Sequence, residues 1–432
     1  MHQHFPKTLV LGIDGLSLAL ARQMADKGIF TNLAPIIGSA HTHAVSSELP
    51  DVSPVNWASF FTGRGPEEHG VYGFTQVNPA TYQMHLVDLN SVQASTVWDW
   101  FGNRGMLSKL INLPCTYPAP SLKGMMISGF VALDLEQAVF PRPLLPMLER
   151  IDYRLEADTV RGLTRPDLLL KDLRETVCSR VRAFDLFWPD LAWSLFVIVF
   201  TELDRMSHFL QDAILDERHR LHRNCMTVLK DIDRAAGHVL ERFNDLAGPK
   251  RLLVVADHGF TALESEVDVN TFLRNEGYLS LGRNPFNELD MGCMDLTSKA
   301  FALDPGRIYI HSRSRFSRGC VNKVEYAGIR ERIRQNLLQL EYQGRKVMDS
   351  VYYGEEIYPS GIGLPPDLLC VPSKGFDLKA KFDRRDVFGH YSRTGTHCPD
   401  DVFFYDSAGT RPEKIRHILP GAGIMGAADH KQ

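Results

Sequence analysis

Residues 193–208 read WSLFVIVFTELDRMSH and join an apolar run to a polar cluster. The run Trp193–Phe200 does not alternate between apolar and polar side chains, which is typical of a strand buried on both faces of a parallel sheet. Doubly wound α/β folds carry their chemistry at the carboxyl ends of such strands. Polar residues that directly follow each apolar run are therefore the first candidates for a functional site.

The rest of the chain repeats this organisation. One helix is predicted over about 224–243, because apolar residues recur there at intervals of three and four. Strands alternating with helices predict an α/β fold with a doubly wound, mostly parallel sheet sandwiched by helices. The other runs that predict buried strands are Thr8–Ile13, Lys109–Leu113, Met125–Ser128 and Leu252–Ala256.

The stretch 267–386 has a different texture, with mixed helix and strand signals and many loops. We expect it to form a cap subdomain inserted into a catalytic core made of residues 1–266 and 387–432. The length of 432 residues is compatible with such a division.

Composition excludes several classes of protein. Lys plus Arg number 48 and Asp plus Glu number 52, a net charge of −4, which argues against binding to a nucleic-acid polymer through a basic surface. The seven cysteines show no close pairing, so neither a disulfide framework nor a zinc finger is expected. The longest apolar stretch, near Leu195–Phe200, is too short for a bilayer, and Asp14 interrupts the N-terminal one. We expect a soluble cytoplasmic protein without membrane contact.

Polar residues follow three of the predicted strands and precede a fourth. In isolation each is explained equally well as a turn, cap or loop residue. Asp204 and His208 are four positions apart and would share one face of a helical turn. Together the set contains carboxylates and imidazoles, which suit zinc or manganese, and two such metal sites are used for in-line attack on phosphorus. The set is Asp14, Asp204, His208, Asp257, His258 and His397.

Residues 50–63, PDVSPVNWASFFTG, supply a candidate nucleophile. We expect Ser53 to cap a helix of about two turns that ends at Gly63, which would place its hydroxyl at the positive end of the helix dipole. Asn56 falls in the first turn, where its amide could donate to a phosphoryl oxygen. Taken alone, Ser53 is better explained as an ordinary helix cap, because Ser-Pro helix starts are common.

These motifs, in this order and spacing, resemble the alkaline phosphatase superfamily. Within it the chain is most similar to the type I phosphodiesterase/nucleotide pyrophosphatase group and its bacterial predicted phosphohydrolase or phosphomutase members. The matching blocks cover nearly the whole chain: LVLGIDGL, FFTGRGPEEHGVYGF, INLPCTYPAP, MMISGF, FTELDRMSHFL, VVADHGF, NTFLRNEGYL, SKAFAL, PPDLLCVP and GTHCPDDVFF.

The resemblance implies a role for each candidate residue. One divalent metal, usually zinc and in some relatives manganese, would be held by Asp14, Asp257 and His258 and shared with the oxygen of Ser53. The second metal would be held by Asp204, His208 and His397. Asn56 would contact a phosphoryl oxygen.

The implied activity is hydrolysis of a small phosphodiester or nucleotide pyrophosphate through a covalent Ser53 intermediate. Ser53 stands where phosphodiesterases of the family usually carry threonine, so a phosphomonoesterase or phosphomutase is the first alternative. Such a site needs an additional cation for the extra charge of a monoester, and Lys299, Arg64 and Arg205 are the candidates. A catalytically silent binding module is the second alternative. We expect the cap to select the leaving group, whose identity the sequence does not give. The sequence leaves open whether the chain forms a homo-oligomer.

Overall fold

The computed structural model describes residues 5–162 and 164–426, which form two compact units. Unit 1 contains the residues up to Gly65, the segment Asp88–Thr261 and the residues from His397 onward. Unit 2 contains Pro66–Val87 and Ala262–Thr396.

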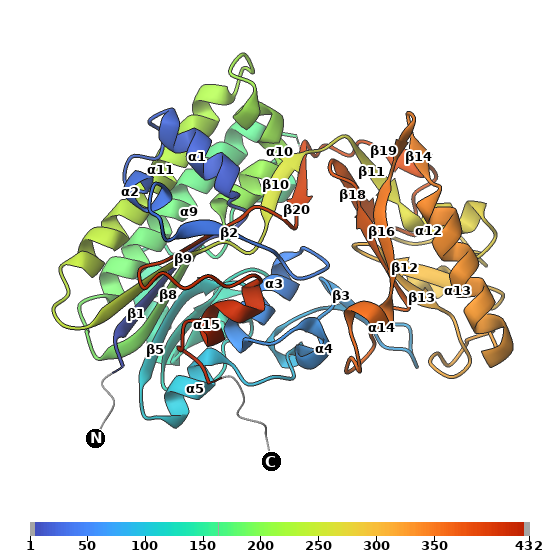
Figure 1. Cartoon of the computed structure of the whole chain (residues 1–432), viewed down its shortest axis with the longest axis horizontal. Coiled ribbons are helices and arrows are strands. Elements are labelled where there is room, and N and C mark those ends of the chain that lie inside the picture. Colours follow the sequence, from blue (N-terminus) through green and yellow to red (C-terminus); the bar gives the residue numbers. More distant parts are fainter. Residues whose placement is uncertain (1–4, 163, 427–432) are drawn as a thin grey trace. The chain divides into compact units, whose positions relative to one another are not determined.

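Unit 1 is built on an eight-stranded sheet (Figure 1). The strands β9, β1, β8, β5 and β6 are parallel neighbours, and antiparallel strands extend both edges. This arrangement confirms the predicted mostly parallel sheet. In spatial order the strands are β2 (Thr42–Val45), β21 (Val402–Asp406), β9 (Lys250–Val255), β1 (Lys7–Ile13), β8 (Trp193–Phe200), β5 (Leu107–Leu113), β6 (Gly124–Ser128) and β7 (Val139–Phe140).

Helices cover both faces of this sheet, as the doubly wound prediction requires (Figure 1). One face carries α1 (Leu18–Asp26), α9 (Pro166–Phe187), α10 (Glu202–Leu215) and α11 (His222–Asn244); the other carries α3 (Ser53–Thr62), α5 (Val97–Asn103) and α15 (Ile418–Gly421). The predicted helix 224–243 lies within α11, whose buried side chains recur at intervals of three and four. The shorter helical elements of unit 1 are α2 (Ala34–Ile37), η1 (Leu89–Ser91), α6 (Leu135–Ala138), η2 (Arg142–Leu144), α7 (Leu145–Arg150), α8 (Thr159–Gly162) and η4 (Ile415–His417).

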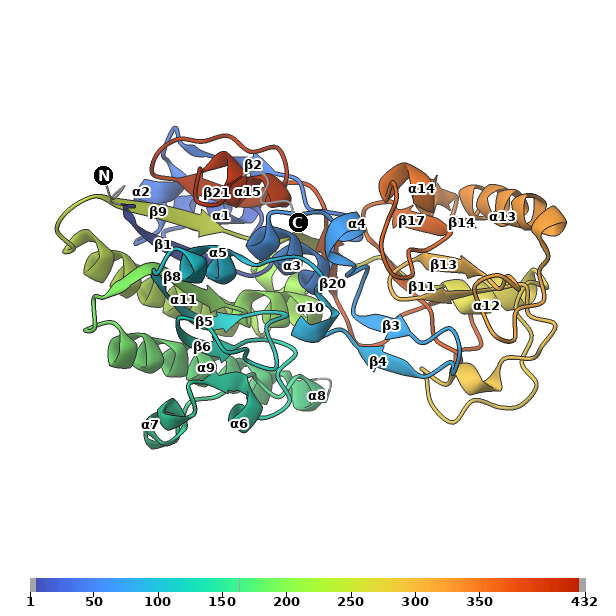
Figure 2. The ribbon, with the colours of Figure 1, turned by 90° about the horizontal axis from the view of Figure 1, so that it is seen from below.

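Unit 2 contains several small sheets and a second apolar core. Its four-stranded antiparallel sheet has the order β12 (Ala300–Leu303), β13 (Arg307–Ile310), β17 (Leu368–Pro372) and β16 (Met348–Tyr353). A three-stranded sheet has the order β18 (Phe376–Lys379), β11 (Ser265–Asp268) and β19 (Phe388–Gly389). Two hairpins, β3 (Thr75–Val77) with β4 (Met84–Leu86) and β14 (Glu341–Tyr342) with β15 (Arg345–Lys346), complete its strands; Figure 2 shows β3 beside β4. The helical elements are α4 (Pro66–His69), α12 (Val269–Asn275), η3 (Met291–Cys293), α13 (Lys323–Leu338) and α14 (Gly354–Ile357).

The predicted cap range, 267–386, lies inside unit 2, but this unit also contains Pro66–Val87 and the flanking residues 262–266 and 387–396, all of which were predicted to belong to the core. The physical reason is the apolar core of unit 2, in which Val77 and Tyr82 are buried. The Arg307 guanidinium also donates a hydrogen bond of 2.9 Å to the carbonyl of Thr75. The chain passes between the units in β10 (Gly259–Ala262) and β20 (Gly395–Cys398), which pair with each other.

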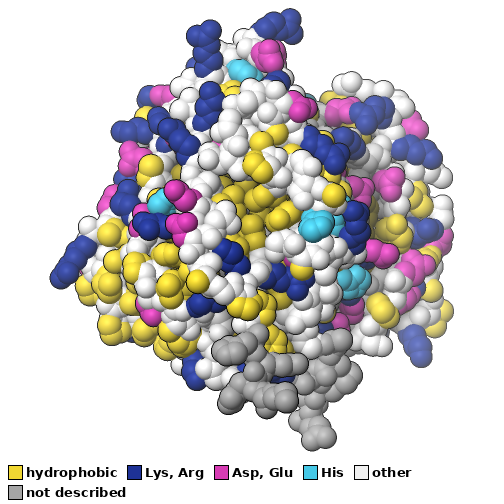
Figure 3. Space-filling view, turned by 60° about the vertical axis from the view of Figure 1, so that its left-hand side comes forward, with side chains coloured by type: hydrophobic (Ala, Val, Ile, Leu, Met, Phe, Trp, Pro, Cys, Tyr) yellow, Lys and Arg dark blue, Asp and Glu magenta, His cyan; other side chains and the backbone are white. Residues whose placement is uncertain are grey.

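Surface charge agrees with the near-neutral composition. On the face drawn in Figure 3, the Lys and Arg side chains are interspersed with Asp and Glu side chains. Among the described residues, none of the helices has the length and apolar character needed to cross a membrane. The cytoplasmic location stays a prediction.

The centre of the sheet should dominate the stability of unit 1. Ile198 on β8 is fully buried and is paired with Leu11 on one side and Ile111 on the other. We expect Ile198→Ala to lower the free energy of unfolding of unit 1 by about 2–5 kcal/mol, because it leaves a cavity between packed strands. All five tryptophans lie in unit 1, so urea unfolding followed by tryptophan fluorescence reports on this unit. As a control, Leu133→Ala, at a side chain 74% exposed, should change the value by less than about 0.5 kcal/mol.

Candidate metal and nucleophile site

Three adjacent strands of unit 1 end at one cluster of polar side chains. Asp14 follows β1, Asp204 lies in the first turn of α10 directly after β8, and Asp257 with His258 follows β9. Because β9, β1 and β8 are parallel neighbours, their carboxyl ends lie at the same edge of the sheet. The sequence expectation that strand ends assemble these residues agrees with the geometry.

The two remaining histidines reach the cluster from other elements. His208 lies one turn after Asp204 on α10, as the four-residue spacing predicted. His397 was expected in a loop, but it lies in β20, whose pairing with β10 brings it beside His258. The rings of His258 and His397 are stacked, with centroids 3.7 Å apart.

Ser53 also lies at this cluster. Its Oγ is 3.2 Å from Nε2 of His258 and 3.5 Å from Oδ1 of Asp14. The prediction that Ser53 caps α3 was wrong by one position, because Val52 is the cap and Ser53 is the first helical residue. Its hydroxyl is therefore free of a capping bond and faces the cluster. The helix ends at Gly63 in the left-handed conformation, as predicted.

The three carboxylates converge on Nε2 of His258. Oδ1 of Asp14, Oδ1 of Asp204 and Oδ2 of Asp257 lie 3.5, 3.6 and 3.3 Å from that nitrogen. All three aspartates are at most 2% exposed, and His258 is fully buried. One buried nitrogen thus faces three carboxylate oxygens from three strand ends.

The second oxygen of each aspartate is held from outside the cluster. Nε1 of Trp57 donates to Oδ2 of Asp14 at 2.9 Å. Nη1 of Arg205 donates to Oδ2 of Asp204 at 2.9 Å. The third outer bond runs from the backbone N–H of Gly15, which has a positive φ of 77°, to Oδ1 of Asp257 at 3.2 Å. These donors fix the carboxylates so that the opposite oxygens point inward.

The imidazoles are oriented in the same way. Nδ1 of His397 is 2.7 Å from the carbonyl of Asp51, and Nδ1 of His258 is 3.2 Å from the carbonyl of Gly259. Carbonyl partners hold the proton on Nδ1 and leave Nε2 as a ligand nitrogen. Nε2 of His397 is 3.1 Å from Nε2 of His208, and both lie within 3.5 Å of Oδ1 of Asp204.

The cluster carries more negative charge than its own protein partners offset. Among the described residues, Oδ1 of Asp204 and Oδ2 of Asp257 are buried without a hydrogen-bond donor. Burial, and then the neighbouring Asp257 and Asp204, hold the pKa of Asp14 well above its usual value. Burial would also raise the pKa of Asp204, but His208 and Arg205 hold it well below the usual value. Buried carboxylate and imidazole ligands that face one point fit a divalent cation such as zinc or manganese.

Two groups of ligand atoms lie close enough to hold one ion each. The first is Asp204, His208 and His397, the set predicted for the second metal. The other is Asp14, Asp204 and His258, so Asp204 is common to both. The sequence predicts Asp257, not Asp204, as the partner of Asp14 and His258. Asp257 lies 3.3 Å from His258 but is not part of the group formed by Asp14, Asp204 and His258.

Asn56 has other partners than the predicted phosphoryl oxygen. Its side chain is fully buried, its Nδ2 donates to the carbonyl of Val52 at 3.2 Å, and its Oδ1 accepts from the backbone N–H of Glu48 at 2.7 Å. Asn56 therefore ties the segment before Ser53 to α3. Trp57, a further residue of this site, is 1% exposed and donates to Asp14. The sequence signal for this role of Trp57 was its position four residues after Ser53, which places both side chains on the same face of the helix.

The candidate cations differ in their placement. Arg205 lies directly beside the cluster, bonded to Asp204. Arg64 follows the C-terminal end of α3, whereas Ser53 begins this helix. Lys299 is exposed and belongs to unit 2, so its role in substrate binding stays a prediction.

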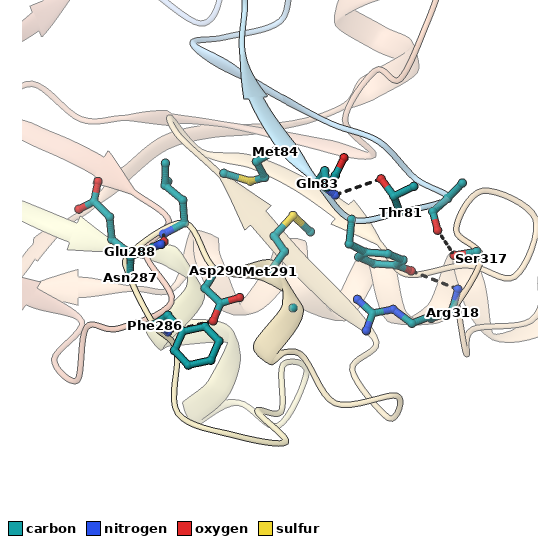
Figure 4. Close-up of a pocket in the computed structure, with 14 residues that line it drawn as sticks. Thr81, Gln83, Met84, Phe286, Asn287, Glu288, Asp290, Met291, Ser317 and Arg318 are labelled. Atoms are coloured by element: carbon teal, nitrogen blue, oxygen red, sulfur yellow. Dashed lines mark hydrogen bonds between the residues drawn. The ribbon is translucent and has the colours of Figure 1, made fainter.

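Unit 2 contains an open cavity of about 870 Å³ (Figure 4). Three segments line it, residues 80–84, 286–292 and 317–318, and Figure 4 shows Met84, Met291 and Arg318 among its side chains. The guanidinium of Arg318 lies 3.9 Å from the ring centroid of Tyr82. This cavity gives the predicted cap a concave surface of mixed apolar and polar character; Lys299 is not among its lining residues.

Comparison with known families agrees with the site. The profile of the family described as type I phosphodiesterase/nucleotide pyrophosphatase matches residues 8–400. This match confirms the resemblance predicted from the motifs. A search of curated protein sequences gave no match.

Solved structures share the fold at low sequence identity. Phosphonoacetate hydrolase from Sinorhizobium meliloti 1021 superposes with a TM-score of 0.62 at 14% identity, covering 93% of this chain and 90% of that one. Human ectonucleotide pyrophosphatase/phosphodiesterase 5 has a TM-score of 0.57 at 14% identity, covering 98% and 96%. Its murine counterpart has a TM-score of 0.55 at 13% identity, covering 98% and 97%. These likenesses confirm the alkaline phosphatase-like fold.

The crowding of carboxylates predicts a measurable strain in the metal-free protein. We expect Asp257→Asn, measured in excess chelator, to raise the midpoint of thermal unfolding by about 2–4 °C. The substitution removes one of three buried negative charges and keeps an acceptor for the N–H of Gly15. Asp185→Asn is the matched control, since this exposed carboxylate also pairs with an imidazole, that of His238 at 2.7 Å. A lower midpoint for Asp257→Asn than for the unaltered protein would contradict the argument.

Proposed function

Because the chain belongs to the type I phosphodiesterase/nucleotide pyrophosphatase family, we propose that it hydrolyses a small phosphodiester or nucleotide pyrophosphate through a covalent intermediate on Ser53. The family supports a phosphohydrolase of this type. The observation that carries the finer proposal is the position of Oγ of Ser53, 3.2 Å from His258 and 3.5 Å from Asp14. A hydroxyl at the first position of a helix also lies where the dipole favours a phosphate group.

The ligands proposed for one metal are Asp14, Asp257 and His258, together with Ser53, and for the other Asp204, His208 and His397. Two divalent cations, Zn²⁺ or Mn²⁺, would stabilise the charge of the phosphoryl oxygens and favour the deprotonated form of the Ser53 hydroxyl. Asp204 belongs to both groups of ligand atoms and so lies between the two proposed ions.

In the proposed reaction Oγ of Ser53 forms a bond to phosphorus while the bond to the leaving oxygen breaks on the opposite side. The leaving group departs with the electron pair of that bond and takes up the proton lost by the Ser53 hydroxyl. Water then attacks phosphorus, the bond from phosphorus to Oγ breaks, and a proton of the water returns to Oγ as the product is released. Throughout the reaction Trp57 holds Asp14, and Arg205 holds Asp204. Asn56 fixes the segment that precedes Ser53.

We propose a diester rather than a monoester as substrate, because the charge of Arg205 is offset by carboxylates. Monoesters carry an additional negative charge, and Arg205 is the predicted extra cation that lies beside the cluster. Its guanidinium is bonded to both Asp204 and Glu156, so its charge is already offset. A phosphomonoesterase or phosphomutase therefore stays the alternative.

Small phosphorus compounds are the proposed substrates. The structures of the similar proteins contain phosphonoformate, phosphonoacetate or AMP, which supports a small anionic ligand. A silent binding module is disfavoured, because the hydroxyl and all six predicted ligands lie in one largely buried cluster. Cytoplasmic location and homo-oligomerisation remain predictions from the sequence.

Replacing the nucleophile tests the proposal directly. We expect Ser53→Ala to lower kcat for bis-p-nitrophenyl phosphate by about a thousandfold or more, since removal of one member of a catalytic unit abolishes most of its effect. Ser59→Ala, a serine to alanine change six residues along the same helix, should retain activity within about a factor of three. Mass spectrometry of the acid-quenched reaction should find the phosphoryl adduct on the peptide that contains Ser53. Ser53→Ala protein with full activity would refute the mechanism.

Metal removal is a separate test. Dialysis against a chelator should abolish hydrolysis of both bis-p-nitrophenyl phosphate and p-nitrophenyl phosphate, and Zn²⁺ or Mn²⁺ should restore it, because the carboxylates need a cation to act on phosphate. Metal content measured by mass spectrometry must be followed in parallel. Full activity in protein shown to contain less than about 0.05 metal ions per chain would exclude a metal-dependent reaction.

A further inference from the structure

We infer that Glu156 determines the charge of the substrate that the site accepts, by neutralising Arg205. The inference rests on the proposed function, since it concerns the same cluster. It assigns to Glu156 a role in specificity. With its carboxylate in place the site favours a monoanionic diester, and without it the activity toward a dianionic monoester rises relative to the diester.

The first step is the position of Arg205 between two carboxylates. Its Nη1 donates to Oδ2 of Asp204 at 2.9 Å and its Nε donates to Oε2 of Glu156 at 3.2 Å. The flat face of the guanidinium lies 3.8 Å from the ring centroid of Phe130. With 12% of its side chain exposed, this cation is held in one orientation beside the candidate ligands.

Glu156 is itself fixed in place. Its Oε1 accepts a hydrogen bond of 3.2 Å from the hydroxyl of Thr201, the residue that precedes α10. Only 20% of its side chain is exposed. The carboxylate therefore offsets the charge of Arg205 in a largely buried setting, where solvent screening is weak.

These groups belong to a chain of alternating charges. Behind Glu156 lies Arg180, which is fully buried and has its Nε 3.6 Å from the carboxylate of Glu202. The order of charges is thus negative at Asp204, positive at Arg205, negative at Glu156, positive at Arg180 and negative at Glu202. Loss of the central negative charge would remove one of the two carboxylates that accept hydrogen bonds from Arg205 and leave Asp204 as the other.

The consequence follows from the charge of the substrate. Arg205 lies near the nucleophile through a short series of contacts: its Nη1 is 2.9 Å from Oδ2 of Asp204, whose Oδ1 is 3.6 Å from Nε2 of His258, and that nitrogen is 3.2 Å from Oγ of Ser53. An unneutralised Arg205 would therefore also act on a phosphoryl group at Ser53. Its attraction is larger for a dianion than for a monoanion, so the preference between the two ester classes shifts.

The experiment compares kcat/KM for bis-p-nitrophenyl phosphate and p-nitrophenyl phosphate in the metal-loaded full chain. We expect Glu156→Gln to lower the ratio of diester to monoester activity about tenfold. Glu175→Gln is the matched control, because it removes the same charge from a carboxylate that is also paired with an arginine, Arg154 at 3.2 Å, but whose side chain is 42% exposed; its ratio should not change. An unchanged ratio in active Glu156→Gln, or an equal change in Glu175→Gln, would overturn the inference.

A double variant isolates the role of Arg205. If the effect passes through this cation, Glu156→Gln should change the ratio less in an Arg205→Gln background than in the unaltered protein. Arg205→Gln alone should raise the ratio above that of the unaltered protein. If Glu156→Gln does not fold, Arg205→Gln still tests the inference. An unchanged or lower ratio of diester to monoester activity in Arg205→Gln would refute it.

Binding of inorganic phosphate gives a readout that does not depend on turnover. At about pH 8, where phosphate is mainly a dianion, calorimetry should find about tenfold tighter binding to Glu156→Gln than to the unaltered protein. Equal affinities would count against the inference. Unaltered protein that hydrolyses neither ester would refute the proposed function, while the phosphate titration would still decide the role of Glu156.

Discussion

The convergence of three buried carboxylates on Nε2 of His258 is the constraint on which the site depends. Oxygens of Asp14, Asp204 and Asp257 lie within 3.6 Å of this nitrogen. Ligand oxygens of Asp14 and Asp204 lie within 4.8 Å of each other, and like charges at such a separation repel strongly inside a protein. The arrangement persists because each carboxylate is held by an outer donor, from Trp57, Arg205 or the backbone of Gly15. The rigid surroundings thus maintain a concentration of negative charge suited to a cation.

The order of the central strands makes this convergence unavoidable. With β1 between β8 and β9, residues that follow the three strands must meet at one edge, although Asp14 and Asp257 are far apart in the sequence. The same packing admits Trp57 close to β1, because a side chain on Gly12 would collide with its ring, at 2.9 Å. The sheet therefore determines both the ligands and the helix that carries the nucleophile.

Features with a local signal were predictable from the sequence. Buried strands are visible as apolar runs, and residues after them, such as Asp204 and His208, could be placed in advance. The partners of Asn56, the strand position of His397 and the place of Pro66–Val87 depend on segments distant in sequence. Glu156 gave no signal at all, because nothing near it in the chain shows that it will meet Arg205. Such contacts become visible only once tertiary packing is known.

The helix α3 couples the nucleophile to the ligand cluster. It carries Ser53, whose hydroxyl is 3.5 Å from one oxygen of Asp14, and Trp57, whose indole holds the other oxygen. A displacement of α3 would therefore move the nucleophile and turn the carboxylate at the same time. Asn56 also ties α3 to the residues before it, through hydrogen bonds to Glu48 and Val52. The helix and this preceding segment are therefore expected to move together. Such coupling favours a preorganised site, in which the attacking oxygen and the ligand oxygen keep a fixed separation.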